Sequence, residues 1–116
     1  MPEPPPDFSV APFAEIAALD RLVHEPARLA ILAALAACQR ADFVYLRRLT
    51  GLSKGNLASH LSKLEAADYV ASAKETRRGR ARTFLSLTKL GRQTLSAHWA
   101  RLDALRTQAE HWGDGQ

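Results

Sequence analysis

The middle of the chain carries two short helical patterns joined by a glycine turn, followed by an arginine-rich segment between two strand-like patterns. Asp42 is a suitable N-cap for a helix over residues 43–49, and Gly51 supplies the left-handed backbone that helix ends commonly need. Ser53 can cap a second helix over about residues 54–67. Two helices joined by about three or four residues form a helix-turn-helix, so this order predicts that motif.

The second predicted helix has one apolar side and one polar side. Leu57, Leu61 and Leu64 recur at i, i+4 and i+7, which gives a single apolar stripe that must face a core. The opposite side carries short or flexible hydrogen-bonding residues, with no acid before Glu65: Lys54, Gly55, Asn56, Ser59, Ser62 and Lys63. A polar helix face is usually only solvated. The turn before this face and the basic segment after it nevertheless favour contact with DNA.

A basic segment, residues 76–82, separates a weak strand pattern over residues 69–75 from a better one over residues 83–87. Gly79 fits a turn, and four arginines surround it, which is more positive charge than a turn requires. Guanidinium groups pair with phosphates bidentately and can enter a narrow minor groove. We therefore expect a β-hairpin with a flexible basic loop that binds DNA. An arginine-rich loop by itself is also compatible with RNA, an acidic protein or no partner.

These segments resemble a known family. Residues 49–65 are similar to the turn and recognition helix of small bacterial winged-helix regulators of the MarR/ArsR type, and so are residues 68–70, the Gly79-Arg80 wing tip and residues 83–91. The resemblance covers roughly residues 19–91 and extends loosely to the C-terminal helix. It implies a mostly α fold with a small β-hairpin, a winged helix-turn-helix domain with N- and C-terminal dimerisation helices. It also implies a homodimeric transcription factor, commonly a repressor.

Side-chain chemistry divides the predicted DNA contacts into base and phosphate contacts. Asn56 can pair with adenine and Lys54 with guanine, whereas Lys63 is expected at the backbone. His60 is either a phosphate contact or a partly buried packing residue, and Arg80 is the favoured wing contact. The predicted recognition residues are Ser53, Lys54, Asn56, Ser59, His60 and Lys63; the predicted wing residues are Lys74, Arg77, Arg78, Arg80 and Arg82. Arg47 and Arg48, on the preceding helix, are expected to touch phosphate or form ion pairs.

The charge distribution agrees with a surface that binds phosphates. The net charge of the chain is +4. Residues 47–92 hold eleven Lys and Arg against three acids and are therefore +8, which leaves −4 for the remainder. Such asymmetry predicts binding to nucleic acid that weakens steeply with salt.

The rest of the 116-residue chain is divided by composition. Residues 1–12 are rich in proline and predict a flexible arm, and residues 113–116 are expected to form a flexible tail. The resemblance implies that residues 13–112 form the winged helix-turn-helix DNA-binding and dimerisation domain. No apolar run approaches the roughly 20 residues that span a bilayer. No signal pattern is present at the N-terminus, and one unpaired cysteine suits a reducing cytoplasm.

Three further helices are predicted outside the helix-turn-helix. Apolar residues at helical spacing predict one over residues 13–23. Pro26 suits the first turn of another, nearly apolar helix over about residues 27–39, which we expect at the centre of the domain. Thr88 can cap a last helix that reaches about Trp112.

The first and last of these helices are expected to build a homodimer, as the resemblance implies. A two-fold dimer would place two recognition helices roughly 34 Å apart on a palindromic operator. The predicted interface residues are Phe13, Ile16, Leu19, Leu95, Trp99, Leu102 and Leu105. The alternative is a last helix folded back onto its own domain. A small apolar effector could bind there, lined by Phe13, Trp99 and Trp112, although these aromatic residues are also compatible with simple interface core.

Catalysis and metal binding are not predicted. The histidines His24, His60, His98 and His111 and the single Cys38 are scattered without the spacing of a zinc site, and we expect no cofactor. No nucleophile, base and orienting acid occur in a recognisable arrangement, so we expect no enzyme activity. Two functions remain: a sequence-specific DNA-binding regulator, and a winged-helix adaptor whose basic wing binds an acidic protein. The acid-free face of the second helix favours the regulator.

Overall fold

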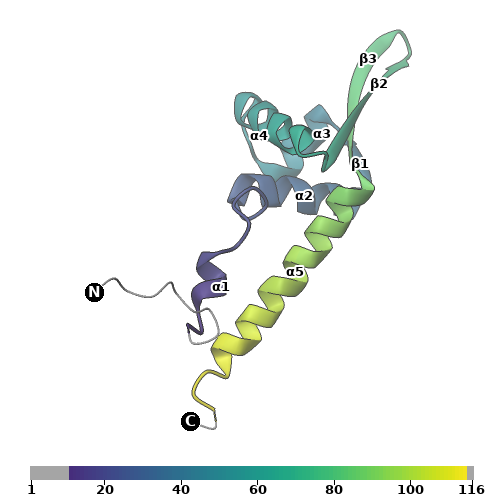
Figure 1. Ribbon diagram of the computed structural model, residues 1–116. Coiled ribbons are helices and arrows are strands. Elements are labelled where there is room, and N and C mark those ends of the chain that lie inside the picture. The colour runs from purple at the N-terminus through teal and green to yellow at the C-terminus, as the bar shows by residue number, and fades with distance from the viewer. Residues whose placement is uncertain (1–10, 115–116) are drawn as a thin grey trace.

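The computed structural model describes residues 11–114, and within them the chain forms a helical body, a long final helix and a projecting β-hairpin (Figure 1). The elements are α1 (Ala14–Ala17), α2 (Pro26–Cys38), β1 (Arg40–Asp42), α3 (Phe43–Thr50), α4 (Lys54–Ala66), β2 (Val70–Arg77), β3 (Arg80–Leu87) and α5 (Lys89–Glu110). This mostly helical fold with a small antiparallel sheet confirms the predicted fold class. The arm predicted over residues 1–12 lies almost wholly outside the described residues, as does part of the predicted tail.

The helix-turn-helix forms as predicted, because its capping residues satisfy the helix ends. The Asp42 carboxylate accepts the Tyr45 N–H at 2.7 Å and begins α3. Gly51 ends α3 in the left-handed conformation, with φ 72°. The Ser53 hydroxyl accepts the Asn56 N–H at 3.2 Å and begins α4. Each such cap stabilises its helix by about 1 kcal/mol relative to alanine.

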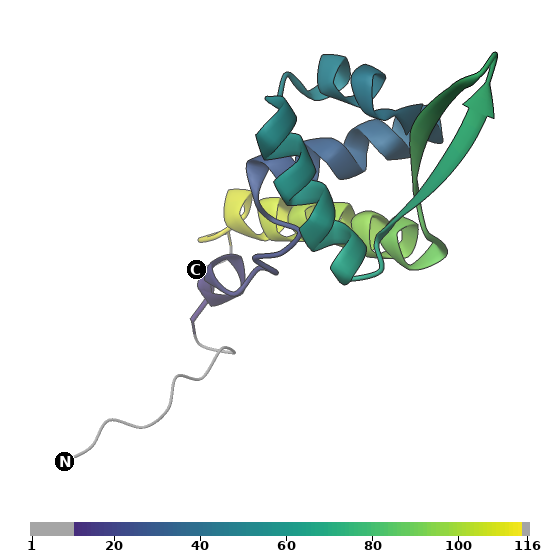
Figure 2. The ribbon, with the colours of Figure 1, turned by 90° about the horizontal axis from the view of Figure 1, so that it is seen from above.

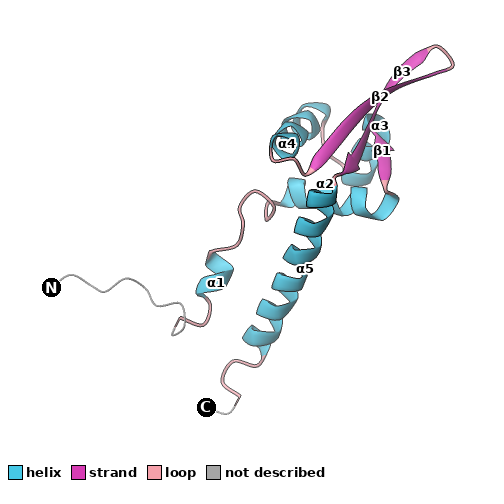
Figure 3. Cartoon of the chain, turned by 45° about the vertical axis from the view of Figure 1, so that its right-hand side comes forward, coloured by secondary structure: helices cyan, strands magenta, loops and turns pink. Residues whose placement is uncertain are grey.

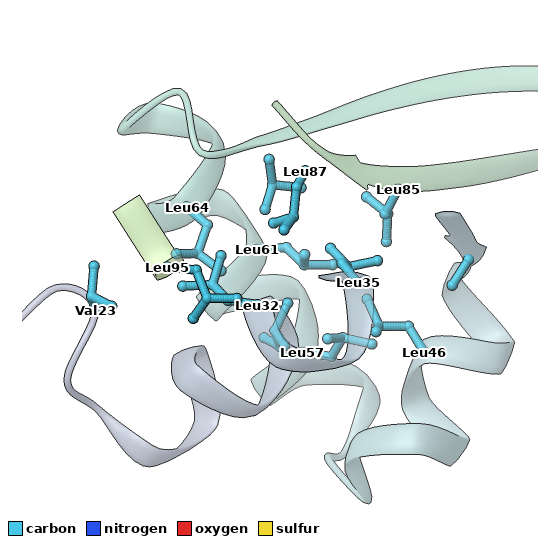
Figure 4. Close-up of a cluster of buried hydrophobic side chains, with 13 residues drawn as sticks. Val23, Leu32, Leu35, Leu46, Leu57, Leu61, Leu64, Leu85, Leu87 and Leu95 are labelled. Atoms are coloured by element: carbon cyan, nitrogen blue, oxygen red, sulfur yellow. The ribbon is translucent and has the colours of Figure 1, made fainter. Parts of the chain in front are cut away.

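The core fixes which side of α4 faces outward. Leu57, Leu61 and Leu64 are buried, so the stripe predicted for this helix is confirmed. They pack with the central helix α2 and with the sheet in one cluster (Figure 4), whose other largest members are Ile31, Leu32, Leu35, Leu46, Leu85, Leu87 and Leu95. Burying one leucine side chain contributes roughly 1.5–3 kcal/mol. Rotating α4 to expose this stripe is therefore too costly, and the polar side is held in solvent.

The sheet has a third strand that the sequence analysis missed. Strands pair antiparallel in the order β1-β3-β2, and β1 lies opposite Ser86 to Phe84 of β3. Ala41 of β1 is buried opposite Leu85. A strand of three residues is too short to show a period-2 pattern, which explains why its sequence gave no signal.

The expectation of a seven-residue basic loop between the strands is wrong. The strands stay paired as far as Arg77 and Arg80, so the turn consists of Arg78 and Gly79 alone. Both turn residues have positive φ, 52° and 75°. Positive φ at both central positions is the geometry of a tight hairpin turn whose twist matches that of the strands. Arg77, Arg80 and Arg82 therefore lie on a paired ribbon, and Arg78 lies in its tight turn and not in a flexible loop.

The prediction of one helix over residues 13–23 is also wrong. The helix α1 has only four residues, Ala14–Ala17. A loop joins it to α2 (Figure 3). The chain turns at Asp20, whose side chain accepts the Leu22 N–H at 2.9 Å and whose carbonyl accepts the His24 N–H at 2.7 Å. Such local hydrogen bonds compete with the helical ladder. Leu19 and Val23 are buried, so the apolar spacing reflects burial against the body without a continuous helix.

The final helix α5 begins firmly on the body and then extends away from it. Thr88 caps it as predicted, accepting the Gly91 N–H at 2.9 Å, and its hydroxyl donates to the Asp68 carbonyl at 2.6 Å. Gly91 is buried against the carbonyl of Tyr69, where a Cβ atom would overlap. Leu95 belongs to the core of its own domain, which corrects its expected place in a dimer interface.

The N-terminal segment lies beside the outer part of α5. The rings of Phe13 and Trp112 meet edge to face at 5.9 Å between centroids. His24 Nδ1 and His98 Nε2 are 3.0 Å apart. Leu19 and Leu105 are buried within the single chain, so they too are not free for a partner. By contrast, the predicted interface residues Phe13, Ile16 and Trp99 remain 46%, 43% and 45% exposed, and Leu102 is partly exposed.

The histidine pair makes stability depend on pH. Burial and then the neighbouring His24 lower the pKa of His98 below its ordinary 6.5. Arg101 acts in the same direction and Asp20 opposes it. The unfolded chain therefore binds more protons than the folded chain as the pH falls through 6.5. The stability that neutral His98 contributes is fully present above pH 6.5. It is lost as the pH falls from 6.5 through the lower pKa that His98 has in the folded chain.

We expect the free energy of unfolding, measured by urea denaturation at a series of pH values, to fall as the pH is lowered through 6.5, the ordinary pKa of histidine. His98→Gln should flatten this dependence, because glutamine cannot take up the proton. His111→Gln is the matched control, since His111 is an exposed histidine near the end of α5. Equal slopes in the wild type and His98→Gln would contradict the assignment.

Candidate nucleic-acid interface

The outward side of α4 presents the recognition residues expected from the sequence, with one exception. Ser53, Lys54, Asn56, Ser59 and Lys63 are all exposed. They lie on the side of α4 that the leucine stripe leaves in solvent. Figure 2 shows α4 on one side of the helical body and the β2–β3 hairpin on the other, with α2 and α3 between them.

His60 is the exception. Its Nδ1 lies 3.2 Å from Arg28 Nη1 and 3.8 Å from a Glu25 carboxylate oxygen, and its side chain is only 20% exposed. Glu25 caps α2 by accepting the Arg28 N–H, and this hydrogen bond lowers the pKa of Glu25. Of the two roles considered for His60, the structure favours packing. It joins α4 to the beginning of α2.

The arginines of the hairpin gather around one hollow. Strand register puts Arg77 opposite Arg80 and Arg82 opposite Glu75, so these side chains share a face of the ribbon. Arg77, Arg78, Arg80 and Arg82 line a hollow of about 470 Å³. Four guanidinium groups around one space repel each other and attract a polyanion. Lys74 is exposed on the opposite face of β2.

Acidic side chains hold part of this charge in place. Arg82 Nη1 lies 3.5 Å from an Asp42 carboxylate oxygen, and Arg77 Nη2 lies 3.6 Å from Glu75. Within residues 11–114, no acidic side chain forms an ion pair with Arg78 or Arg80. These two arginines therefore have the freest charges of the hairpin.

Arg40 of β1 is a basic residue of this region that the sequence analysis missed. It donates two hydrogen bonds to Glu75, at 3.0 and 2.9 Å, which lower the pKa of the Glu75 carboxyl. Its guanidinium also lies 3.8 Å from the centroid of the Phe84 ring. Arg40 thus connects all three strands partway along the hairpin, between its base and its turn. Arg40 precedes Glu75 by 35 residues in the sequence and reaches it only because β1 pairs with β3. No local sequence pattern could therefore have predicted this contact.

Helix α3 forms the rim of the same surface. Arg47 and Arg48 are exposed, and Arg47 Nε donates to the Leu52 carbonyl at 3.4 Å. Between α3 and β3 lies a second hollow of about 630 Å³, lined mainly by Asp42, Phe43, Val44, Tyr45, Arg48 and Arg82. The rim therefore combines arginine side chains with exposed apolar surface.

The three aromatic residues expected to line an effector site are not brought together within one chain. Phe13 and Trp112 contact each other, but Trp99 lies on α5, about 16 Å along the helix axis before its last residue, Glu110. Over residues 11–114, no three His, Cys, Asp or Glu side chains gather closely enough to hold a metal ion. None of the described helices is long and apolar enough to cross a membrane.

Comparison with known proteins agrees with this geometry. The family profile of the winged helix DNA-binding domain matches residues 27–105. An uncharacterized protein of Methanocaldococcus jannaschii is 35% identical over 72 residues, which are 62% of this chain and 78% of that protein. This relative is archaeal, so the likeness extends beyond the bacterial regulators named above.

Solved structures extend the comparison to the whole arrangement of helices and hairpin. A transcriptional regulator homologue from Pyrococcus horikoshii superposes with a TM-score of 0.75 at 26% identity, covering 84% of this chain and 96% of that chain. A cysteine-to-serine variant of Escherichia coli MarR, solved in complex with operator DNA, superposes with a TM-score of 0.55 at 17% identity. That match covers 78% of this chain and 74% of that chain, and it shows the fold alone.

Proposed function

The chain belongs to the winged helix DNA-binding domain family, and from this premise we propose that it is a sequence-specific transcriptional regulator. It acts as a homodimer, as a repressor on a palindromic operator. The observation that supports the proposal is the combination of an exposed, acid-free side of α4 with an arginine-lined hollow on the β2–β3 hairpin. A duplex is the ligand that this combination fits best.

The proposed contacts divide by chemistry. Lys54 and Asn56 read base edges from the first turn of α4, Ser53 and Ser59 bind phosphate or either base edge, and Lys63 binds the DNA backbone. The hairpin, here called the wing, places Arg78 and Arg80 at its tip, where they neutralise phosphates or enter the minor groove.

The proposed dimer forms through the N-terminal segment and α5. Support comes from the apolar side chains left exposed there, among them Phe13, Ile16 and Trp99. These exposed apolar side chains are distributed along the N-terminal segment and α5, and a two-fold partner packed along both would cover them. A small apolar effector at this interface would act by changing the distance between the two α4 helices. If no effector exists, the same residues serve as interface core.

Selection from a random duplex pool, followed by binding of the selected duplex at several salt concentrations, tests the proposal. We expect an inverted repeat that binds far more tightly than scrambled DNA, with affinity that falls steeply as salt rises. Failure to enrich any motif would contradict the proposal. It would instead favour the winged-helix adaptor whose basic wing binds an acidic protein.

Asn56→Ala should relax the sequence preference at one position in each half-site. A bidentate amide contact with adenine contributes about 1–3 kcal/mol of discrimination, so the preference there should fall roughly 5- to 150-fold. The fold should persist, because the cap on Ser53 uses the backbone N–H of Asn56 and not its side chain. Binding to single-base variants of the selected duplex measures the change. Gln108→Ala, an exposed amide on α5, is the matched control.

A further inference from the structure

Gly55 is the second residue of α4, and it lies in the middle of the outward side of that helix. At 100° per residue, Gly55, Ser59 and Ser62 follow one line, opposite the line of Leu57 and Leu64. Gly55, Ser59 and Ser62 are exposed, whereas Leu57 and Leu64 are buried. Lys54 and Asn56, the two proposed base readers, flank this line on either side. Gly55 is therefore central to the surface proposed to face DNA.

The fold itself gives no reason for a glycine at this position. Every other glycine of the described residues has such a reason: Gly51, Gly79 and Gly113 have positive φ, and a Cβ at Gly91 would overlap the Tyr69 carbonyl. At Gly55 the φ is not positive, and a Cβ would meet nothing within 4 Å. Glycine also weakens a helix relative to alanine, because it loses more backbone freedom on folding.

The missing side chain leaves backbone open to a ligand. The Ser53 hydroxyl oxygen accepts a hydrogen bond from the Asn56 N–H, and the Ser53 carbonyl accepts one from the Leu57 N–H. Within residues 11–114 no acceptor is found for the Gly55 N–H. Any residue larger than glycine would place its Cβ between this backbone and a duplex lying against α4.

We propose that Gly55 determines how closely α4 approaches DNA, and that it is glycine so that backbone and DNA can be in direct contact. This inference rests on the proposed function and names a specificity-determining position within it. A close approach brings the side chains of Lys54 and Asn56 within reach of base edges. An added methyl group would lift this end of the helix and lengthen both contacts together.

Gly55→Ala tests the inference because it predicts opposite changes in stability and in binding. Thermal unfolding should occur at the wild-type temperature or a few degrees higher, since alanine favours the helix and meets no neighbour. Affinity for the selected operator should fall at least tenfold, and Gly55→Val should bind more weakly still. Affinity for scrambled duplex should change little, because the wing arginines are intact.

Gln93→Ala is the matched control, since it adds helix propensity at an exposed position near the start of α5, before the exposed Trp99. It should keep the wild-type affinity for operator. If Gly55→Ala binds operator as tightly as the wild type, or if it unfolds at a clearly lower temperature, the inference is overturned. If wild-type protein selects no duplex at all, the proposed function fails first and the inference fails with it. Loss of operator binding by Gly55→Ala alone leaves the proposed function standing and supports the inference.

Discussion

Replacing Gly91 by alanine is expected to destabilise the fold by about 3 kcal/mol, the largest loss expected from one added methyl group in this chain. Gly91 lies in the first turn of α5, where its Cα faces the backbone of Tyr69. An added Cβ would overlap the Tyr69 carbonyl oxygen, which also accepts the Thr88 N–H at 3.0 Å. Backbone atoms cannot move aside as the end of a flexible side chain can. The start of α5 would have to separate from the segment between α4 and β2.

Urea denaturation of Gly91→Ala measures this loss. Gln93→Ala, an exposed substitution two residues further along α5, is the control and should change the free energy of unfolding by less than about 0.5 kcal/mol. A loss below about 1 kcal/mol for Gly91→Ala would show that α5 can shift without breaking the contact with Tyr69.

Removing Arg78 and Arg80 together should weaken binding to every duplex by roughly 100-fold at moderate salt, since each arginine neutralises about one phosphate. These two are the wing arginines without an ion pair to an acid in the described part of the chain, so their charge is available to DNA. The slope of log affinity against log salt should become shallower by about 2 for each protomer. Sequence preference should change less than overall affinity, because these contacts are mainly to the backbone.

The matched control removes the same charge elsewhere. Arg101 and Arg106 lie on the exposed part of α5, and Arg106 is held by Asp103 and Glu110 at 2.7 and 3.0 Å. Arg101→Ala with Arg106→Ala should leave the salt slope within about 0.5 of wild type. Equal weakening by both double variants would mean that net charge, and not the wing, sets the affinity.

Local patterns were enough to predict the helix-turn-helix. The caps at Asp42 and Ser53, and the stripe of Leu57, Leu61 and Leu64, depend on residues within one or two turns of each other. Helix caps and apolar stripes can therefore be recognised from the spacing of residues in the sequence. The apolar stripe in turn determines which residues of α4 face outward, so the exposure of Lys54 and Asn56 also followed from it.

What could not be predicted depends on contacts between distant residues. His60 was ambiguous because Arg28 and Glu25, which hold it, belong to another helix. Arg40 joins the wing only because β1 pairs with β3. The buried Leu95 and Leu105 have the same helical spacing as the exposed Trp99, and only the packed structure separates core from free surface. Periodicity gives the face of a helix but not the neighbour that covers it.

The two-residue turn of the wing has a consequence for the entropy of binding. A seven-residue loop would lose its conformational freedom when it met DNA, at a cost of roughly 1–2 kcal/mol for each residue that became ordered. In this chain that ordering takes place during folding, because the strands are paired up to Arg77 and Arg80 and because Arg40 holds Glu75 of β2. The wing therefore meets a duplex as a ribbon of fixed width. In the proposed complex, it would distinguish duplexes by the width of their minor groove and would adapt little to a groove that does not fit.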